Sequence, residues 1–211
     1  MKYLLTFILL VNASFAFDNL KIQQEGQLDP EFKNVSEELS KTSALKSLFT
    51  QSKKIKVLKR PLKSSGRLIF DRSIGVFWEL QKPFKSTIVI DKDKLTSIDD
   101  DGKKITIKAE EKPMLYGFTK IFLAIFSGNT KELKEHFEIY YGKSSEGWKI
   151  GLIPKSSSLK KVLSKILLIG SESTVSAITL WEENGDITNI EFSKTQKLDK
   201  LDENDRRKFE F

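Results

Sequence analysis

The sequence predicts an α+β protein whose antiparallel sheet, of about ten to eleven strands, forms an incomplete, unclosed barrel with helices over its concave apolar face. Three observations support this fold class. Short segments of alternating apolar and polar residues recur, Asp-Gly and Asn-Gly turns connect some of them, and one apolar segment of helical periodicity interrupts the series. A sheet of this length must curl, and its apolar inner face then encloses an interior.

The N-terminus has the organisation of a secretion signal. A charged start precedes an apolar run over residues 3–11 that is too short to cross a bilayer, and Ser14 and Ala16 form a small-x-small cleavage site. We expect residues 1–16 to be a signal peptide cleaved after Ala16, residues 17–211 to form one domain, and the protein to be periplasmic. The chain has no cysteine, which excludes disulfides and thiol chemistry.

The elements follow in order from the residue patterns. Residues 17–30 are polar and predict a loose lead-in, and apolar residues recur at helical spacing over 32–52, which predicts an amphipathic helix. Strands are expected at 55–58, 66–72, 76–81, 87–91, 94–98, 103–108, 137–141, 148–154, 166–170, 174–182 and 187–193, and 209–211 is a candidate last strand. Helices are expected at 113–126 and 131–135, with a turn at 61–65 and a loop or helical turn at 158–164.

Alternate residues of the expected strands 66–72 and 76–81 share one face, which is apolar except for Arg72. The segment 113–126 is more apolar than is usual for a surface helix, and we expect it to cover this face. The residues predicted to line a pocket for an apolar ligand are Leu68, Phe70, Arg72, Val76, Trp78, Leu80, Ile88, Ile90, Leu115, Phe118, Phe122 and Phe126. A filled core has the same pattern, and the volume of the interior distinguishes the two.

Charge and composition restrict the function classes. The formal net charge is +7, and basic residues gather over 53–67, where they could face anionic lipid headgroups, an acidic partner or solvent alone. His136 is the single histidine, at an element boundary where a structural role is favoured, and no phosphate-binding loop or metal-ligand motif occurs. We therefore expect no enzyme, no metal, no cofactor and no nucleic-acid partner.

An ordered set of short motifs resembles the periplasmic outer-membrane lipoprotein carrier family, of the LolA type. The set covers most of residues 32–193, and its order is more specific than any member. Its members are Phe49-Thr50-Gln51 near the end of the expected helix, Gly66-Arg67-Leu68, Arg72 six residues before Trp78, Pro83, the run 86–90, Trp148 with Pro154-Lys155, and Asn184-Gly185 before Ile190-Glu191-Phe192.

The resemblance implies an incomplete antiparallel barrel with helices closing its mouth. It implies a monomeric carrier that takes the acyl chains of lipoproteins from an inner-membrane ABC-type exporter to an outer-membrane acceptor. An Arg at the position of Arg72 would hold the helical lid shut through hydrogen bonds, which suits a guanidinium with several donors.

Departures from the family pattern keep other functions open. Ser73 stands where the family usually has Pro, the segment 113–126 is more apolar than a general carrier's lid, and the family's extension after the Phe-x-Phe strand is missing before Phe211. These features resemble paralogues associated with glycolipid or aryl-polyene-type pigment export. A periplasmic sensor module that binds lipids or proteins is a further alternative, whereas a lipid hydrolase lacks an evident nucleophile and base.

Overall fold

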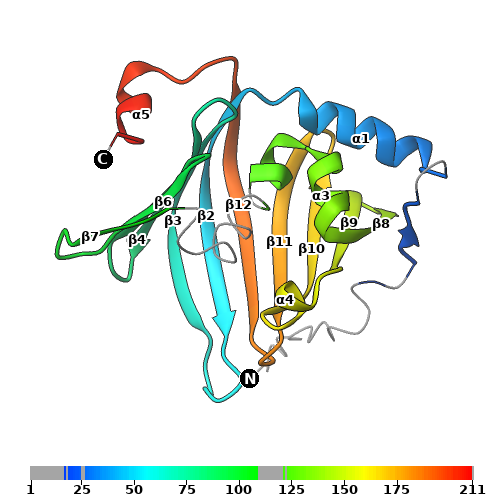
Figure 1. Cartoon of the computed structure of the whole chain (residues 1–211), viewed down its shortest axis with the longest axis horizontal. Helices are drawn as coiled ribbons and strands as arrows, with labels where there is room; N and C mark the ends of the chain where they lie inside the picture. The colour runs from blue at the N-terminus through cyan, green and yellow to red at the C-terminus, as the bar shows by residue number, and fades with distance from the viewer. Residues whose placement is uncertain (1–16, 18, 25–26, 109–120, 122, 211) are drawn as a thin grey trace, which may run out of the picture.

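The structure is a computed structural model, and it describes residues 17, 19–24, 27–108, 121 and 123–210. Their strands form one antiparallel sheet in the order β1-β8-β9-β10-β11-β12-β2-β3-β4-β5-β6-β7 (Figure 1). The strands are β1 (Lys21–Ile22), β2 (Ala44–Lys54), β3 (Leu62–Asp71), β4 (Gly75–Lys82), β5 (Ser86–Ile90), β6 (Lys94–Ile98), β7 (Lys104–Lys108), β8 (Phe137–Ser144), β9 (Gly147–Pro154), β10 (Leu163–Ser171), β11 (Thr174–Glu182) and β12 (Ile187–Leu198).

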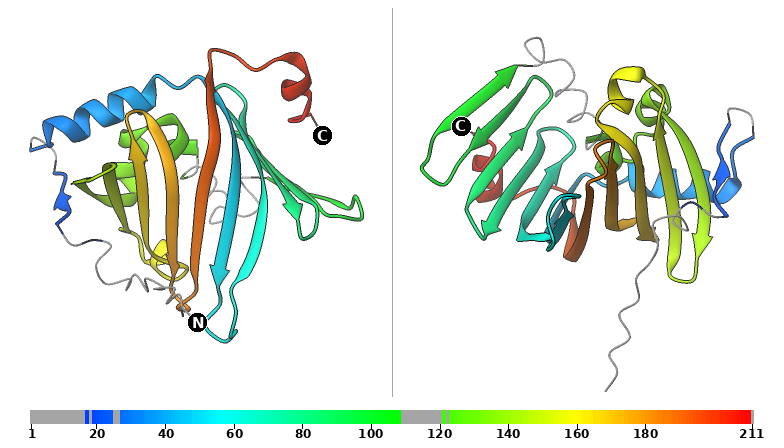
Figure 2. Two further views of the ribbon diagram at one scale, coloured as in Figure 1. Left: turned by 180° about the vertical axis from the view of Figure 1, so that it is seen from behind. Right: turned by 90° about the horizontal axis from the view of Figure 1, so that it is seen from below.

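The sheet curls but does not close, since β1 and β7 remain its two edges within the described part of the chain (Figure 2). This confirms the predicted unclosed barrel, with twelve strands instead of ten to eleven. The predicted strands 94–98 and 174–182 coincide with β6 and β11, and most others differ from the observed strands by one or a few residues at their ends. The signal peptide expected over 1–16 lies outside the described residues.

Helices cover the concave face of the sheet. They are α1 (Pro30–Ser40), α3 (Thr130–His136) and α4 (Ser157–Lys160), and residues 121 and 123–127, here named the inner helix, are helical as well. Phe32 of α1, Leu133 of α3 and Leu159 of α4 are buried in the same apolar core as the inner faces of the strands. No helix among the described residues is long and apolar enough to cross a membrane.

The predicted helix over 32–52 is wrong in its second half. Asp29 caps α1 by accepting a hydrogen bond from the Glu31 amide at 2.9 Å, and the helix ends at Ser40. From Ala44 the chain is strand β2, which lies between β12 and β3 in the middle of the sheet. Pairing with a strand on each side outweighs the helical spacing of its apolar residues, because propensity is a weak preference compared with tertiary context.

Other expected boundaries are corrected in the same way. Residues 55–58, predicted as a strand, form the turn of the β2–β3 hairpin, and β3 already begins at Leu62 within the predicted turn 61–65. The polar lead-in contains the short strand β1, which pairs with β8. A helix, α5 (Glu203–Arg207), occupies the charged tail, and Phe209 follows it without forming the candidate last strand.

The C-terminal tail covers part of the outer face of the sheet. Ile69, Phe77 and Val89 point to this face, and Leu201 packs with them in a second buried cluster. Phe209 lies against Phe77, with ring centroids 6.1 Å apart. In Figure 1, α5 is accordingly separated from α1, α3 and α4, on the other side of β12.

A β-bulge in β12 lies shortly before the C-terminal tail, which leaves the sheet and folds over its outer face. The pairing of β12 with β2 shifts between Ser193 and Gln196, and Lys194 has a φ of 53°. The Ser47 hydroxyl lies 3.0 Å from the Ser193 carbonyl oxygen and 2.8 Å from the Thr195 hydroxyl, so one buried side chain stabilises the irregular backbone.

Ion pairs connect the tail to the sheet. The buried carboxylate of Asp205 contacts the ammonium groups of Lys46 on β2 and Lys208, and Lys46 also lies 3.2 Å from Asp202. Burial by itself would raise the pKa of Asp205, but the two lysines outweigh burial and hold this pKa below its ordinary value of 3.8. Asp205 therefore favours the docked tail only while it is ionised.

Replacing Asp205 with Asn should lower the free energy of unfolding by about 1–2 kcal/mol at neutral pH, because charge-assisted hydrogen bonds are lost. The folded-state pKa is depressed, so the contribution is complete above 3.8 and disappears as the pH falls through the folded-state value. Urea unfolding of both proteins at neutral pH and at about pH 3 measures the effect. Asp199→Asn, at an exposed neighbouring site, is the control, and an equal loss in both variants would contradict the role of Asp205.

Candidate functional site

The inner faces of β3, β4 and β5 form one apolar wall. Leu68, Phe70 and Val76 are at most 1% exposed, and the register places Phe70 opposite Val76. Trp78 and Leu80 are partly buried against the same core, as is Ile88, and Ile90 is buried within it. The structure thus brings all seven apolar strand residues of the predicted pocket to one inner face, whereas their contact with a ligand stays a prediction.

Aromatic side chains occupy the centre of this wall. The Trp78 ring stacks on Phe49 of β2, with centroids 3.9 Å apart, and meets Phe192 of β12 edge-on at 6.3 Å. Phe49 and Phe192 were not among the residues predicted for the pocket. Phe49 was missed because 32–52 was interpreted as a helix, and the adjacent apolar residues Leu48 and Phe49 interrupt the alternation that would indicate a strand.

The inner helix covers the aromatic centre. Phe126 is 4% exposed, and its ring lies 6.1 Å from Phe70 and 5.7 Å from Phe192 between centroids. Ile121 and Ile125 are buried in the same core. Leu115, Phe118 and Phe122, which were predicted to cap the pocket, lie outside the described residues.

The C-terminal end of the inner helix abuts the end of α1. Gly128 has a φ of 61°, and a side chain there would place its Cβ 2.6 Å from the Cβ of Leu39 and 2.7 Å from the Ser40 amide nitrogen. Only glycine permits both the left-handed conformation and this close approach. Asn129 then caps α3 by accepting a hydrogen bond from the Glu132 amide at 3.2 Å.

Arg72 connects the two helix ends to the sheet. It lies in the turn directly after β3, and its Nε and Nη2 donate to the Thr42 carbonyl at 3.1 and 2.9 Å. Nη2 also donates to the carbonyls of Ser40, at the end of α1, and of Ser127, at the end of the inner helix, the latter at 3.0 Å. One guanidinium therefore joins the ends of α1 and the inner helix to the rim of the sheet, whereas its role in closing a lid stays a prediction.

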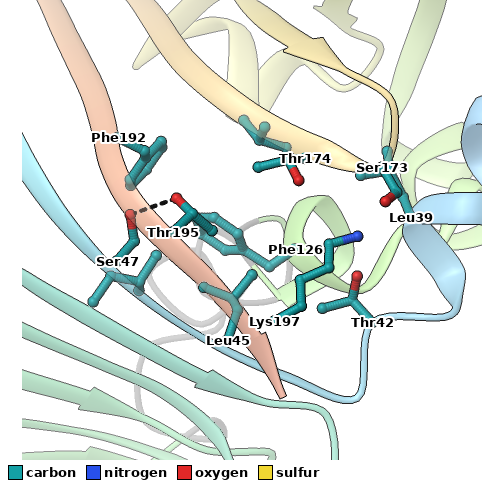
Figure 3. A pocket seen from close by; sticks show the side chains of 12 residues that line it. Leu39, Thr42, Leu45, Ser47, Phe126, Ser173, Thr174, Phe192, Thr195 and Lys197 are labelled. Atoms are coloured by element: carbon teal, nitrogen blue, oxygen red, sulfur yellow. Dashed lines mark hydrogen bonds between the residues drawn. The ribbon is translucent and has the colours of Figure 1, made fainter. Parts of the chain in front are cut away.

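One small cavity lies against Phe126 of the inner helix. Its volume is about 10 Å³, room for roughly one water. Its lining comprises Leu39, Thr42, Leu45, Ser47, Leu68, Phe126, Ser173, Thr174, Val175, Phe192, Thr195 and Lys197 (Figure 3). This cavity is too small for an acyl chain, so the binding of such a chain at this place would require the inner helix to move.

Polar groups gather at one side of this cavity. Figure 3 shows the Lys197 ammonium directed toward Thr42 and Ser173, away from the Ser47–Thr195 hydrogen bond. Removal of water from around the ammonium lowers the pKa of Lys197, although Glu38 and Glu172 act in the opposite direction. The cavity thus passes from an apolar floor, at Leu68 and Phe126, to a polar opening.

One cluster of the described residues has side-chain atoms close enough together to bind a metal ion. Ligand atoms of Glu132, Glu135 and His136 lie within 4.8 Å of one another at the end of α3. The Nε2 atom of His136 is 3.5 Å from a Glu132 carboxylate oxygen, and 38% of the His136 side chain is exposed. The three residues lie within two turns on the surface of one short helix, so their spacing along α3 accounts for this arrangement.

Comparison with known proteins gives a consistent set of matches. The family model described as "Outer membrane lipoprotein carrier protein LolA" matches residues 40–211. An outer-membrane lipoprotein carrier protein of Legionella pneumophila (strain Corby) is 30% identical over 139 residues, which are 66% of this chain and 66%, somewhat under two thirds, of that protein. One from Dechloromonas aromatica (strain RCB) is 27% identical over 161 residues, 75% of this chain and 74% of that protein. Among solved structures, a LolA superfamily protein from Nitrosomonas europaea matches with a TM-score of 0.47 at 9% identity, over 83% of this chain and 96% of that one.

Truncating Phe126 to Ala should lower the free energy of unfolding by about 3–5 kcal/mol, because a buried ring is replaced by a void. The same variant should bind an environment-sensitive fatty-acid probe more tightly than the unaltered protein, since the void lies beneath the inner helix. Urea unfolding and probe fluorescence measure the two effects. Phe84→Ala is the matched control, since Phe84 is 72% exposed, and a change within about 0.5 kcal/mol is expected there. Equal destabilisation by both substitutions would refute the packing role of Phe126.

Proposed function

The chain belongs to the outer membrane lipoprotein carrier protein LolA family, and on this premise we propose that it is a periplasmic carrier that shields the acyl chains of lipoproteins, or of a related amphiphile, between its sheet and its inner helix. The carrier would receive its cargo from an inner-membrane exporter of the ABC type and deliver it to an outer-membrane acceptor. It would act as a monomer and without a cofactor, because shielding requires apolar surface and no bond chemistry.

The contact of Arg72 with the two helix ends is the observation that carries this proposal. A filled core needs no guanidinium at its rim, and apolar contacts alone would hold the helices in place. Arg72 instead bonds to three carbonyl oxygens, of Ser40, Thr42 and Ser127, that belong to separate elements. Such a contact stabilises the closed state and can be broken as a unit, because all of its bonds end on one side chain.

The energetics of opening suit a carrier that must also release its cargo. Burial of an acyl chain contributes about 0.8 kcal/mol per methylene, but the chain would displace side chains of the inner helix, Phe126 among them, that are already buried. Cargo and helix therefore compete for the same apolar wall, and the net affinity is much smaller than the gross burial. Bonds to Arg72, which form again when the inner helix returns, favour release.

Two cargo classes fit this mechanism equally well, namely lipoproteins and lipids of the glycolipid or aryl-polyene type. Expression with the signal segment in a periplasm, purification without detergent, solvent extraction and mass spectrometry would identify what the protein carries. We expect an acyl-bearing molecule in stoichiometric amount, and its headgroup or peptide part distinguishes the two classes. An empty protein that also fails to bind a fatty-acid probe would refute the carrier function.

Replacing Arg72 with Leu should produce a protein that binds cargo but releases it poorly. The closed state would lose on the order of 2 kcal/mol, so transfer to an acceptor should fall by about tenfold or more while loading persists. A reconstituted transfer assay with the variant in its loaded form measures this effect. Arg207→Leu, on the exposed helix α5, is the matched control and should transfer normally. Unchanged transfer by Arg72→Leu would exclude the closing role of Arg72.

A further inference from the structure

One end of the sheet exposes apolar side chains at the tips of two turns. Val57 and Leu58, in the turn between β2 and β3, are 86% and 45% exposed, and Phe84, in the turn between β4 and β5, is 72% exposed. Leu62, at the start of β3, is 53% exposed. Large apolar side chains this exposed, and gathered at one end of a fold, indicate an interaction surface.

The two turns lie at the same end of the sheet. The register pairs Lys53 with Leu62 in the β2–β3 hairpin and Ser65 with Lys82 between β3 and β4. Both the β2–β3 turn and the β4–β5 turn therefore lie next to the N-terminal end of β3. Lys63, Lys82 and Glu191 border one open concavity of about 570 Å³. Figure 1 shows the β2–β3 hairpin and the β11–β12 turn at this end of the sheet, and the Lys56 amide donates to Asp186 of that turn at 3.0 Å. We name turns 55–61 and 83–85, with Leu62, Lys63 and Lys82, the basic end.

Basic residues greatly outnumber acidic residues at the basic end. The segment 53–63, KKIKVLKRPLK, holds six basic residues and no acidic residue, and Phe84 is flanked by Pro83 and Lys85. Two neighbouring carboxylates already have partners, since Glu182 pairs with Lys53 at 2.7 Å and Asp186 accepts from the Lys56 amide at 3.0 Å. Among the described residues that border the concavity with Lys63 and Lys82, Glu191 is the one carboxylate. Lys54, Lys56, Lys59 and Arg60 are exposed and form no ion pair with any residue that the structure describes.

We propose that the basic end is a docking surface for an anionic lipid bilayer. Lysines that alternate with aliphatic and aromatic tips match the membrane interface, where cations meet phosphate groups and apolar side chains enter the acyl boundary. Phosphate groups would also find the lysines and hydroxyl groups of the concavity between Lys63 and Lys82 within reach. An acidic protein would satisfy the lysines but offers no general reason for Val57 and Phe84 to project from separate turns.

Docking in this way would leave the closing contact accessible. Arg72 follows the C-terminal end of β3, whereas the basic end lies at the N-terminal end of the same strand. The bilayer would therefore contact one end of the sheet while α1 and the inner helix remain free to separate at the other. This proposal goes beyond the carrier function and does not depend on it, because an empty protein offers the same surface.

Flotation of the purified, cargo-free protein with vesicles tests the proposal. We expect it to float with vesicles of phosphatidylethanolamine and phosphatidylglycerol at low salt and to dissociate at about 0.5 M salt, but not to float with phosphatidylcholine vesicles. The triple variant Lys56→Gln, Lys59→Gln, Arg60→Gln should bind the anionic vesicles roughly 100-fold more weakly. The double variant Val57→Ser, Phe84→Ser should retain the attraction at low salt and dissociate at lower salt than the unaltered protein.

Matched charge removal elsewhere provides the control. Lys33→Gln, Lys92→Gln, Lys200→Gln removes the same charge from exposed positions outside the basic end and should bind vesicles almost as the unaltered protein does. The proposal is overturned if the unaltered protein does not float with anionic vesicles, or if both triple variants lose binding equally. Fatty-acid probe binding, measured on the same proteins, reports the carrier function separately and should be unchanged in every variant.

Discussion

The inner face of the sheet has to be covered, and this constraint organises the molecule. A sheet that curls without closing keeps a wide apolar surface that its own backbone pairing cannot bury. Leu68, Phe70 and Val76 are buried in one core with Phe126 of the inner helix, whose ring lies 6.1 Å from that of Phe70. The cover contributes no strand to the sheet, so it contacts the wall through side chains and through the bonds of Arg72 alone.

This division separates the stable part of the fold from the part that can move. Strands β2 and β12 share ten paired positions, and neither depends on the helices for its backbone hydrogen bonds. The inner helix, in contrast, is held by ring contacts such as those of Phe126 and by carbonyls at its end. Displacing the inner helix would expose apolar surface but break no backbone hydrogen bond between strands. The inner helix could therefore open while the sheet stays intact.

The outer surface of the sheet is equally differentiated. Near one end, the tail buries Ile69 and Phe77 and is anchored by the charge of Asp205, which makes this part of the fold sensitive to acid. At the opposite end of β3, the turns carry exposed lysines and exposed apolar tips. The inner wall is apolar and buried, the tail is held by apolar contacts and ion pairs, and the basic end is charged and exposed.

The residue pattern alone determined the fold class, most strand positions from 66 to 193 and the shared face of Leu68, Phe70 and Val76, because period-two alternation is a local property. It also singled out Arg72 through the resemblance to the carrier family. Only the tertiary structure decided that 44–54 is a central strand. It pairs with β3 on one side and, on the other, with β12, which lies more than 130 residues later in the sequence. The same holds for the aromatic contacts of Phe49 and Phe192, the carbonyl partners of Arg72 and the docked tail, since each joins residues that no local pattern relates.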